Sequence, residues 1–195
     1  NQLTFKIGPG GLAVAEVANS HATATVVLQG AHITSWTPRK QKPVIWLSPV
    51  AKFAAGKSIR GGVPICWPWF GPHSSDAKLP GHGYARTVPW EVIASKALRN
   101  GATQLAFRLV ESDATRAQWP YLSPVELHIT VGATLAMQLI THNTGKTPIT
   151  IGDALHTYFA VSDIRDVYIH GLGQCSYLDK MDGGKRKQQS GPVVI

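Results

Sequence analysis

The sequence predicts an all-β protein in which short strands form a sandwich or a barrel. Several stretches alternate apolar and polar side chains, the pattern of a strand with one buried face. Glycine pairs and turns separate these stretches, and prolines at 38, 43, 49 and 148 favour short strands. The chain has no internal repeat and no low-complexity tract, so a layered β architecture is the simplest interpretation.

The individual strands follow in chain order. Two β-rich runs, 22–28 and 31–36, are separated by Gln29-Gly30, a tight connection. Residues 103–109 and 125–131 alternate apolar with polar or small side chains, as half-buried strands do. Gly132-Ala133 then turns the chain into 134–143, which completes a hairpin.

One short helix interrupts the strands. Ser112 or Asp113 supplies an N-cap, because either side chain accepts a hydrogen bond from a free backbone N–H group. The helix is expected to run through Gln118 and to stop at Trp119-Pro120, since a residue before proline avoids the helical conformation.

Composition points to one domain over residues 1–195. With 44% hydrophobic residues, the chain can bury a sizeable core. It contains no apolar run near the ~20 residues that span a bilayer and no signal-peptide pattern, so no membrane partner is expected. Only Cys66 and Cys175 occur, which favours a reducing, cytoplasmic location.

The net charge of +8 suits either a nucleic-acid binder or an enzyme for an anionic substrate. The 19 basic residues are scattered, apart from Lys185-Arg186-Lys187, which is expected to be a solvated loop. No strand interleaves aromatic with basic residues, as single-stranded nucleic-acid binding requires. A nucleic-acid partner is therefore not expected, and a basic nucleic-acid-binding β domain is kept as the third hypothesis.

The most informative segment is 58–71, Ser-Ile-Arg-Gly-Gly-Val-Pro-Ile-Cys-Trp-Pro-Trp-Phe-Gly, followed by Gly-His-Gly-Tyr-Ala-Arg at 81–86. Glycine lets a backbone approach a ligand closely, and aromatic rings supply apolar walls. Arginine offers a planar set of donors that matches phosphate or carboxylate oxygens. The two segments together predict a pocket for a polar, anionic small molecule.

These two segments resemble the signature runs of the hexose-6-phosphate mutarotases, the glucose-6-phosphate 1-epimerase branch of the aldose 1-epimerase superfamily. Asp-Ala-Leu-His-Thr-Tyr-Phe at 153–159 is similar to the family's catalytic-histidine segment. The resemblance covers about residues 25–182. It implies a galactose-mutarotase-like β-supersandwich with a sugar cleft on its concave sheet.

The resemblance also implies roles for individual residues. His156 would be the acid that protonates the ring oxygen of a hexose 6-phosphate, with His82 beside it. Arg60 and Arg86 would hold the phosphate, and Gly81 occupies a position where some relatives carry a ligand-contacting glutamine. Opening and closing a sugar ring needs only proton transfers, so neither a metal nor another cofactor is expected. The remaining histidines show no metal-ligand spacing.

Structural roles are the alternative for each of these residues. Taken alone, His156 is more typical of a hydrogen-bonded core histidine, and His82 suits a glycine-rich turn as well as a ligand contact. Arg60 and Arg86 could form ordinary ion pairs, although their glycine-flanked positions favour ligand contact. The aromatic residues Trp67, Trp69 and Phe70 are expected to pack in the core rather than to stack on a sugar.

The sequence departs from the resembled family at its C-terminal end. Family members carry, further along, an aspartate that contacts the sugar and a glutamate that acts as the base, and no glutamate here lies in a matching context. We therefore expect a C-terminally incomplete domain whose exposed sheet edge is covered by another chain or fragment. Alone, it is expected to bind weakly and to accelerate anomerisation little. A non-catalytic sugar-phosphate-binding module is the second hypothesis.

Overall fold

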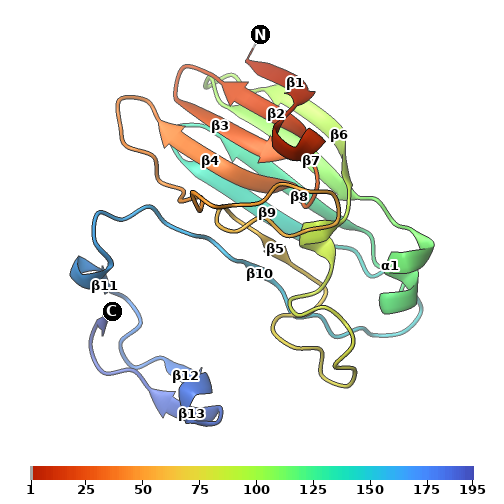
Figure 1. Cartoon of the computed structure of the whole chain (residues 1–195), viewed down its shortest axis with the longest axis vertical. Helices are drawn as coiled ribbons and strands as arrows, with labels where there is room; N and C mark the ends of the chain where they lie inside the picture. Colours follow the sequence, from red (N-terminus) through yellow and green to blue (C-terminus); the bar gives the residue numbers. More distant parts are fainter. Residues whose placement is uncertain (1) are drawn as a thin grey trace. The chain divides into compact units, whose positions relative to one another are not determined.

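The computed structural model describes residues 2–195, and contacts along the chain divide it into two compact units, the first ending at Ala160 and the second running from Val161 to Ile195. The first unit contains two four-stranded antiparallel sheets (Figure 1). One sheet has the order β1 (Leu3–Ile7), β2 (Ala13–Ala18), β3 (Ala22–Val27), β4 (His32–Pro38). The other has the order β6 (Trp90–Ala97), β7 (Thr103–Leu109), β8 (Val125–Val131), β9 (Leu135–Thr141).

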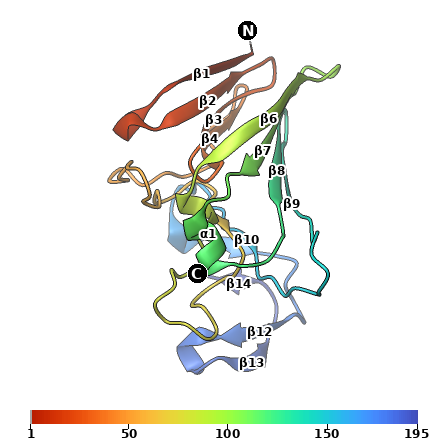
Figure 2. The same cartoon turned by 90° about the vertical axis from the view of Figure 1, so that its right-hand side faces the viewer.

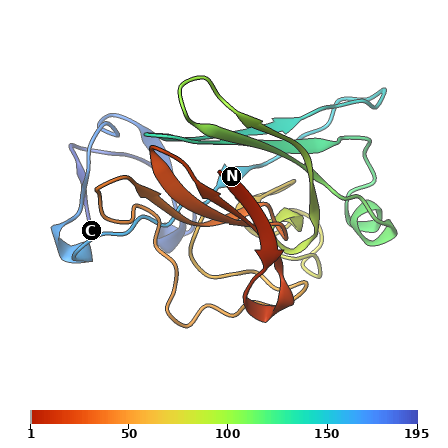
Figure 3. The same cartoon turned by 90° about the horizontal axis from the view of Figure 1, so that it is seen from above.

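The two sheets pack face to face and share one hydrophobic core. Figure 2 shows them edge-on as two layers, and Figure 3 shows the same layers from above. In strand β8, Leu127 and Ile129 are fully buried, while Glu126 and His128, which alternate with them along the strand, are only partly buried. These apolar side chains join one cluster with Val26 and others from the first sheet. Burial of this cluster is the main force that holds the sandwich together.

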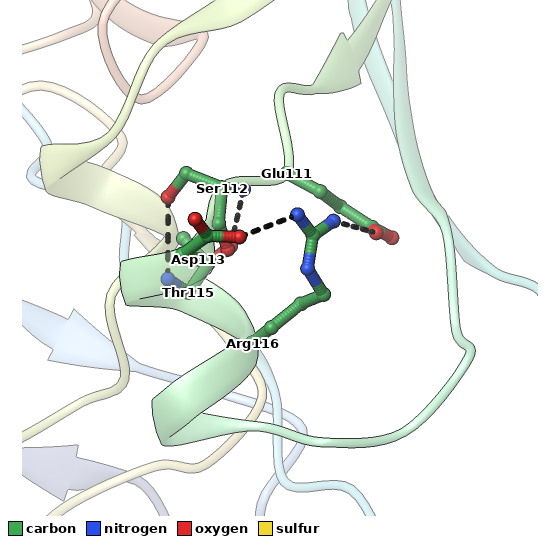
Figure 4. Close-up of polar contacts among 5 residues, drawn as sticks. All are labelled: Glu111, Ser112, Asp113, Thr115 and Arg116. Carbon is green, nitrogen blue, oxygen red and sulfur yellow. Dashed lines mark hydrogen bonds and ion pairs between the residues drawn. The ribbon is translucent and has the colours of Figure 1, made fainter.

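The predicted helix is present as α1 (Asp113–Gln118), with Ser112 as its N-cap. Ser112 Oγ accepts from the Thr115 N–H at 3.2 Å, and Thr115 Oγ1 accepts from the Ser112 N–H at 2.8 Å (Figure 4). Arg116 bridges Asp113 and Glu111 at 2.9 and 3.6 Å. Six residues are too few to be stable alone, so these contacts and the tertiary structure hold the helix.

Short elements complete the two units. In the first they are η1 (Pro9–Gly11), β5 (Ile65–Cys66), η2 (Ala85–Thr87) and β10 (Ala154–Leu155), with β5 paired to β10. The second unit contains η3 (Ile164–Asp166), β11 (Tyr168–Ile169), β12 (Ser176–Asp179), η4 (Lys180–Asp182), β13 (Lys185–Gln188) and β14 (Val193–Val194). Its strands form two antiparallel pairs, β11 with β14 and β12 with β13.

The predicted strands are confirmed where one buried face makes apolar and polar residues alternate. The prediction for the run of basic residues at 185–187 is wrong. The Lys185–Lys187 run is strand β13, not a solvated loop. Lys187 Nζ pairs with Asp179 of β12 at 2.8 Å and with Asp182 of η4 at 3.0 Å, so the ion pairs lie within the β12–β13 hairpin. An exposed two-stranded hairpin buries no face, so nothing in its hydrophobic pattern reveals it.

In residues 2–195 no helix combines the length and the apolar character needed to cross a bilayer. The single domain over residues 1–195 stays a prediction.

Candidate active site

The β5–β10 pair brings the His156 segment alongside the 58–71 segment. Ala154 pairs with Cys66 and Leu155 with Ile65. The pairing continues beyond β10, because the His156 N–H donates to the Pro64 carbonyl at 3.0 Å and the Tyr158 N–H to the Gly62 carbonyl at 2.9 Å. His156 thus follows directly from a strand pair whose partner segment also carries Arg60.

His82, in the segment 81–86, lies close to His156. Its ring centroid lies 6.1 Å from that of His156, and Phe70 contacts both rings, at 4.9 Å from His82 and 6.2 Å from His156. The Gly71 N–H donates to His82 Nδ1 at 3.2 Å. Since Nδ1 is an acceptor here, a neutral His82 carries its ring proton on Nε2. The two histidines that the sequence singles out are neighbours in the structure.

A backbone in the left-handed region presents His82. Both His82 and Gly83 have φ of 69°. For a residue other than glycine this conformation is uncommon, although histidine is enriched there. Gly83 lies against Trp67 so closely that a Cβ would be 2.0 Å from the Trp67 carbonyl oxygen. The close approach explains why glycine follows the histidine.

We expect Gly83→Ala to lower the free energy of unfolding by about 2–4 kcal/mol, since it adds left-handed strain and a backbone overlap. Gly81→Ala is the matched control, because a Cβ there meets nothing closer than the Gly71 carbonyl oxygen at 3.8 Å. Urea denaturation of the two variants measures the difference. Equal stability would mean that residues 82–83 do not pack against Trp67 as described.

The two arginine-bearing segments both contact residues Gly30–His32, which end the β3–β4 connection and include the first residue of β4. The Gly61 carbonyl accepts from His32 Nε2–H at 2.8 Å. Gly30 lies against the backbone of Arg86, where a Cβ would be 2.7 Å from the carbonyl oxygen. Arg60 itself is exposed and Arg86 is half-buried. Residues 30–32 thus contact Gly61, next to Arg60, and the backbone of Arg86.

Gly81 contacts Arg86 through its backbone. The Gly81 carbonyl accepts a hydrogen bond from Arg86 Nη2 at 2.9 Å. This bond orients one edge of the guanidinium group. Binding of a ligand by His156, His82, Arg60, Arg86 and Gly81 stays a prediction, and the structure places these five residues in segments that contact one another.

Phe70 and Tyr158 are aromatic residues that the sequence reasoning missed. Phe70 was expected in the core with Trp67 and Trp69, which are indeed 2% and 8% exposed, but Phe70 is 44% exposed. Tyr158 also contacts His156, with ring centroids 5.2 Å apart. An unbroken apolar run does not mark where the chain leaves the core. Gly71-Pro72, directly after Phe70, was the available signal.

Two buried groups near the site have shifted pKa values. Burial lowers the pKa of His32 to about 4, with the nearby positive charge of Arg86 acting in the same direction. Burial raises the pKa of the Cys66 thiol, which the Arg86 charge partly opposes. Both groups are therefore neutral at neutral pH.

The His32 shift predicts a pH-dependent stability. The unfolded chain binds a proton at this histidine below pH ~6.5 and the folded chain only near pH 4, so stability falls as pH drops through this window. The loss is on the order of 3 kcal/mol for the shift. We expect His32→Gln to remove this part of the slope in denaturation between pH 7 and 4.5. Identical slopes in the two proteins would show that His32 is not held neutral.

Within residues 2–195, His, Cys, Asp and Glu form no group of three or more that is suited to a metal ion. The expected independence from metals and other cofactors stays a prediction.

The fold belongs to a known class. A crystal structure described as a "putative mutarotase" from Salmonella typhimurium superposes with a TM-score of 0.90 at 36% identity, covering 99% of this chain and 63% of that one. A galactose mutarotase related enzyme from Lactobacillus acidophilus, at 17% identity and a TM-score of 0.71, covers 93% of this chain and 65% of its own and shares the fold. The protein is a galactose-mutarotase-like β-sandwich, as the sequence predicted.

The sequence places it more closely. The profile of the family Aldose 1-epimerase matches residues 14–192, and the chain belongs to this family. Proteins named "Putative glucose-6-phosphate 1-epimerase" from Salmonella typhimurium and Escherichia coli are 41% and 40% identical over 169 residues. Each match covers 87% of this chain and 55% of the relative. The chain thus spans about half the length of the curated relatives it matches.

Proposed function

We propose that this chain binds hexose 6-phosphates and takes part in interconverting their α and β anomers, the activity of a glucose-6-phosphate 1-epimerase. Membership of the aldose 1-epimerase family and the names of the 40–41% identical relatives support the reaction class and the substrate. The observation that carries the proposal is the pair His156 and His82, whose ring centroids lie 6.1 Å apart. Hydrogen bonds connect the segments of both histidines to the segments that contain Arg60 and Arg86.

His156 is the proposed proton donor to the ring oxygen. Opening a pyranose ring needs a proton at that oxygen and removal of another from the anomeric hydroxyl, and histidine is the side chain best suited to such transfers near neutral pH. The His156 side chain is partly exposed, so a substrate can reach it. The ring centroids of Phe70 and Tyr158 lie 6.2 and 5.2 Å from that of His156, so the two aromatic side chains restrict the orientation of the imidazole.

His82 is the proposed hydrogen-bonding partner of the same substrate. Its Nδ1 is engaged by the Gly71 N–H, so its Nε2–H is the group that donates to a sugar oxygen. A donor held beside the acid orients the ring oxygen for protonation. The aromatic face of Phe70, in contact with both histidines, gives the site an apolar wall.

Arg60 and Arg86 are the proposed phosphate ligands. Guanidinium groups bind phosphate oxygens through two parallel hydrogen bonds, which is stronger than a single neutral bond. The net charge of +8 favours the approach of an anionic sugar. A phosphate held at one end of the hexose leaves its ring oxygen free to meet the histidines.

Exchange NMR of the α and β anomers of glucose 6-phosphate tests this function. Because the chain spans about half of its relatives' length, the assay uses both the chain itself and a chimaera that adds the remaining part of the Salmonella relative. Faster exchange than in buffer supports an epimerase. Binding without any acceleration in either protein would instead support the sugar-phosphate-binding module. Failure of both proteins to bind glucose 6-phosphate would refute the proposal.

A further inference from the structure

His32 is a fully buried histidine that the proposed chemistry does not use. Its side chain is 0% exposed at the start of β4, and Nε2 donates to the Gly61 carbonyl at 2.8 Å. The other nitrogen, Nδ1, has no hydrogen-bond partner among the described residues 2–195. A buried polar ring with one nitrogen unsatisfied is costly, so its single bond calls for an explanation.

The segment that His32 contacts is conformationally free without such contacts. Gly61 and Gly62 have φ of 98° and 71°, in the region that glycine alone enters readily. Three backbone hydrogen bonds hold the segment: Ser48 N–H to the Arg60 carbonyl at 3.1 Å, Gly62 N–H to the Trp46 carbonyl at 2.7 Å, and Tyr158 N–H to the Gly62 carbonyl at 2.9 Å. The Gly61 carbonyl is held instead by the side chain of His32.

The fit between His32 and this segment is close. A Cβ on Gly62 would lie 2.4 Å from His32 Nε2, so the ring and the glycine backbone are in direct contact. Gly30, two residues before His32, lies against the backbone of Arg86. A change at His32 therefore moves the Gly61 peptide, and with it the direction in which Arg60 leaves the backbone.

We propose that His32 is a positioning residue: by donating Nε2–H to the Gly61 carbonyl, it sets the orientation of Arg60 toward the phosphate of the substrate. The proposal rests on the function proposed above, since it assumes that Arg60 binds phosphate. Neutrality suits the role, because burial and the Arg86 charge keep the ring uncharged and able to donate from one nitrogen only.

Three substitutions separate the hydrogen bond from the shape of the ring. His32→Gln keeps an uncharged N–H donor at about the reach of Nε2. His32→Asn carries the same amide on a shorter side chain that stops near the position of Nδ1, and His32→Leu removes the donor at similar volume. Arg60→Ala reports on the phosphate grip itself. All four are made in the full chain and their stabilities are compared by denaturation.

The measurements are dissociation constants for glucose 6-phosphate and for glucose, from NMR titrations, and the backbone amide signals of Gly61 and Gly62 without ligand. We expect His32→Leu and His32→Asn to weaken glucose 6-phosphate binding about 10-fold, with glucose binding within about twofold. The same two variants should shift both amide signals. His32→Gln should restore native values of both quantities. If His32→Leu does not fold, the Gln and Asn pair decides.

The outcomes distinguish the inference from the function on which it rests. Equal loss in the Gln and Asn variants, or equal loss for glucose and glucose 6-phosphate, would overturn the positioning role while Arg60→Ala still shows a selective loss. Native binding by Arg60→Ala would overturn the phosphate grip, and the inference with it.

Discussion

Replacing His156 with asparagine is expected to slow the exchange of glucose 6-phosphate anomers by about 100- to 10,000-fold, the usual contribution of a general acid or base. Asparagine still donates a hydrogen bond but does not release a proton. Binding of glucose 6-phosphate should change little, because the proposed phosphate ligands lie on other residues. Exchange NMR on the chimaera measures the rate, and titration measures the binding.

His142→Asn is the matched control, since His142 is an exposed histidine outside the candidate site. It should leave the exchange rate within about twofold of the native value, as surface substitutions usually do. Native activity in His156→Asn would assign the proton transfer to another group and remove the central role proposed for His156.

The second large effect is expected for the arginines. Arg60→Ala and Arg86→Ala should each weaken binding of glucose 6-phosphate by about 1.5–3 kcal/mol, the range of a charge-assisted hydrogen bond. Glucose, which lacks the phosphate, should bind both variants like the native chain. Isothermal titration with the two sugars gives the comparison.

Arg39→Ala controls for net charge. Arg39 is exposed, and its substitution removes the same unit of positive charge from the surface. The double variant Arg60→Ala/Arg86→Ala adds a test of shared ligation. If both guanidinium groups hold one phosphate, the double loss should differ from the sum of the single losses. Equal weakening by Arg39→Ala would mean that only overall charge attracts the substrate.

Sequence patterns predicted the elements that have one buried face. Residues 103–109 and 125–131 are strands β7 and β8 with the predicted bounds, because each alternates between the core and the exterior. Strand β6 did not stand out, since only Trp90 among its residues is buried. Hydrophobic periodicity arises from burial of one face, so a largely exposed strand shows little of it in the sequence.

The candidate site was predictable only in part for a related reason. Arg60, His82 and His156 lie in local runs of glycine, proline and aromatic residues that stand out in the sequence. His32 does not, because its role depends on which residue of a distant segment lies above it. That contact is set by the packing of β4 against residues 61–63, which no local pattern encodes.

The β5–β10 pair links the order of folding to the assembly of the site. Both strands have two residues and come from distant parts of the chain, so their pairing closes a long loop for few hydrogen bonds. Such contacts are expected to form after the hairpins of the two sheets and to open before the sheets do. The amide protons of His156 and Tyr158 should then exchange with solvent faster than those of β7 and β8. A sugar phosphate that contacts both the β5 and the β10 segments would stabilise their pairing and slow that exchange. Hydrogen–deuterium exchange at His156 and Tyr158 would therefore report ligand binding.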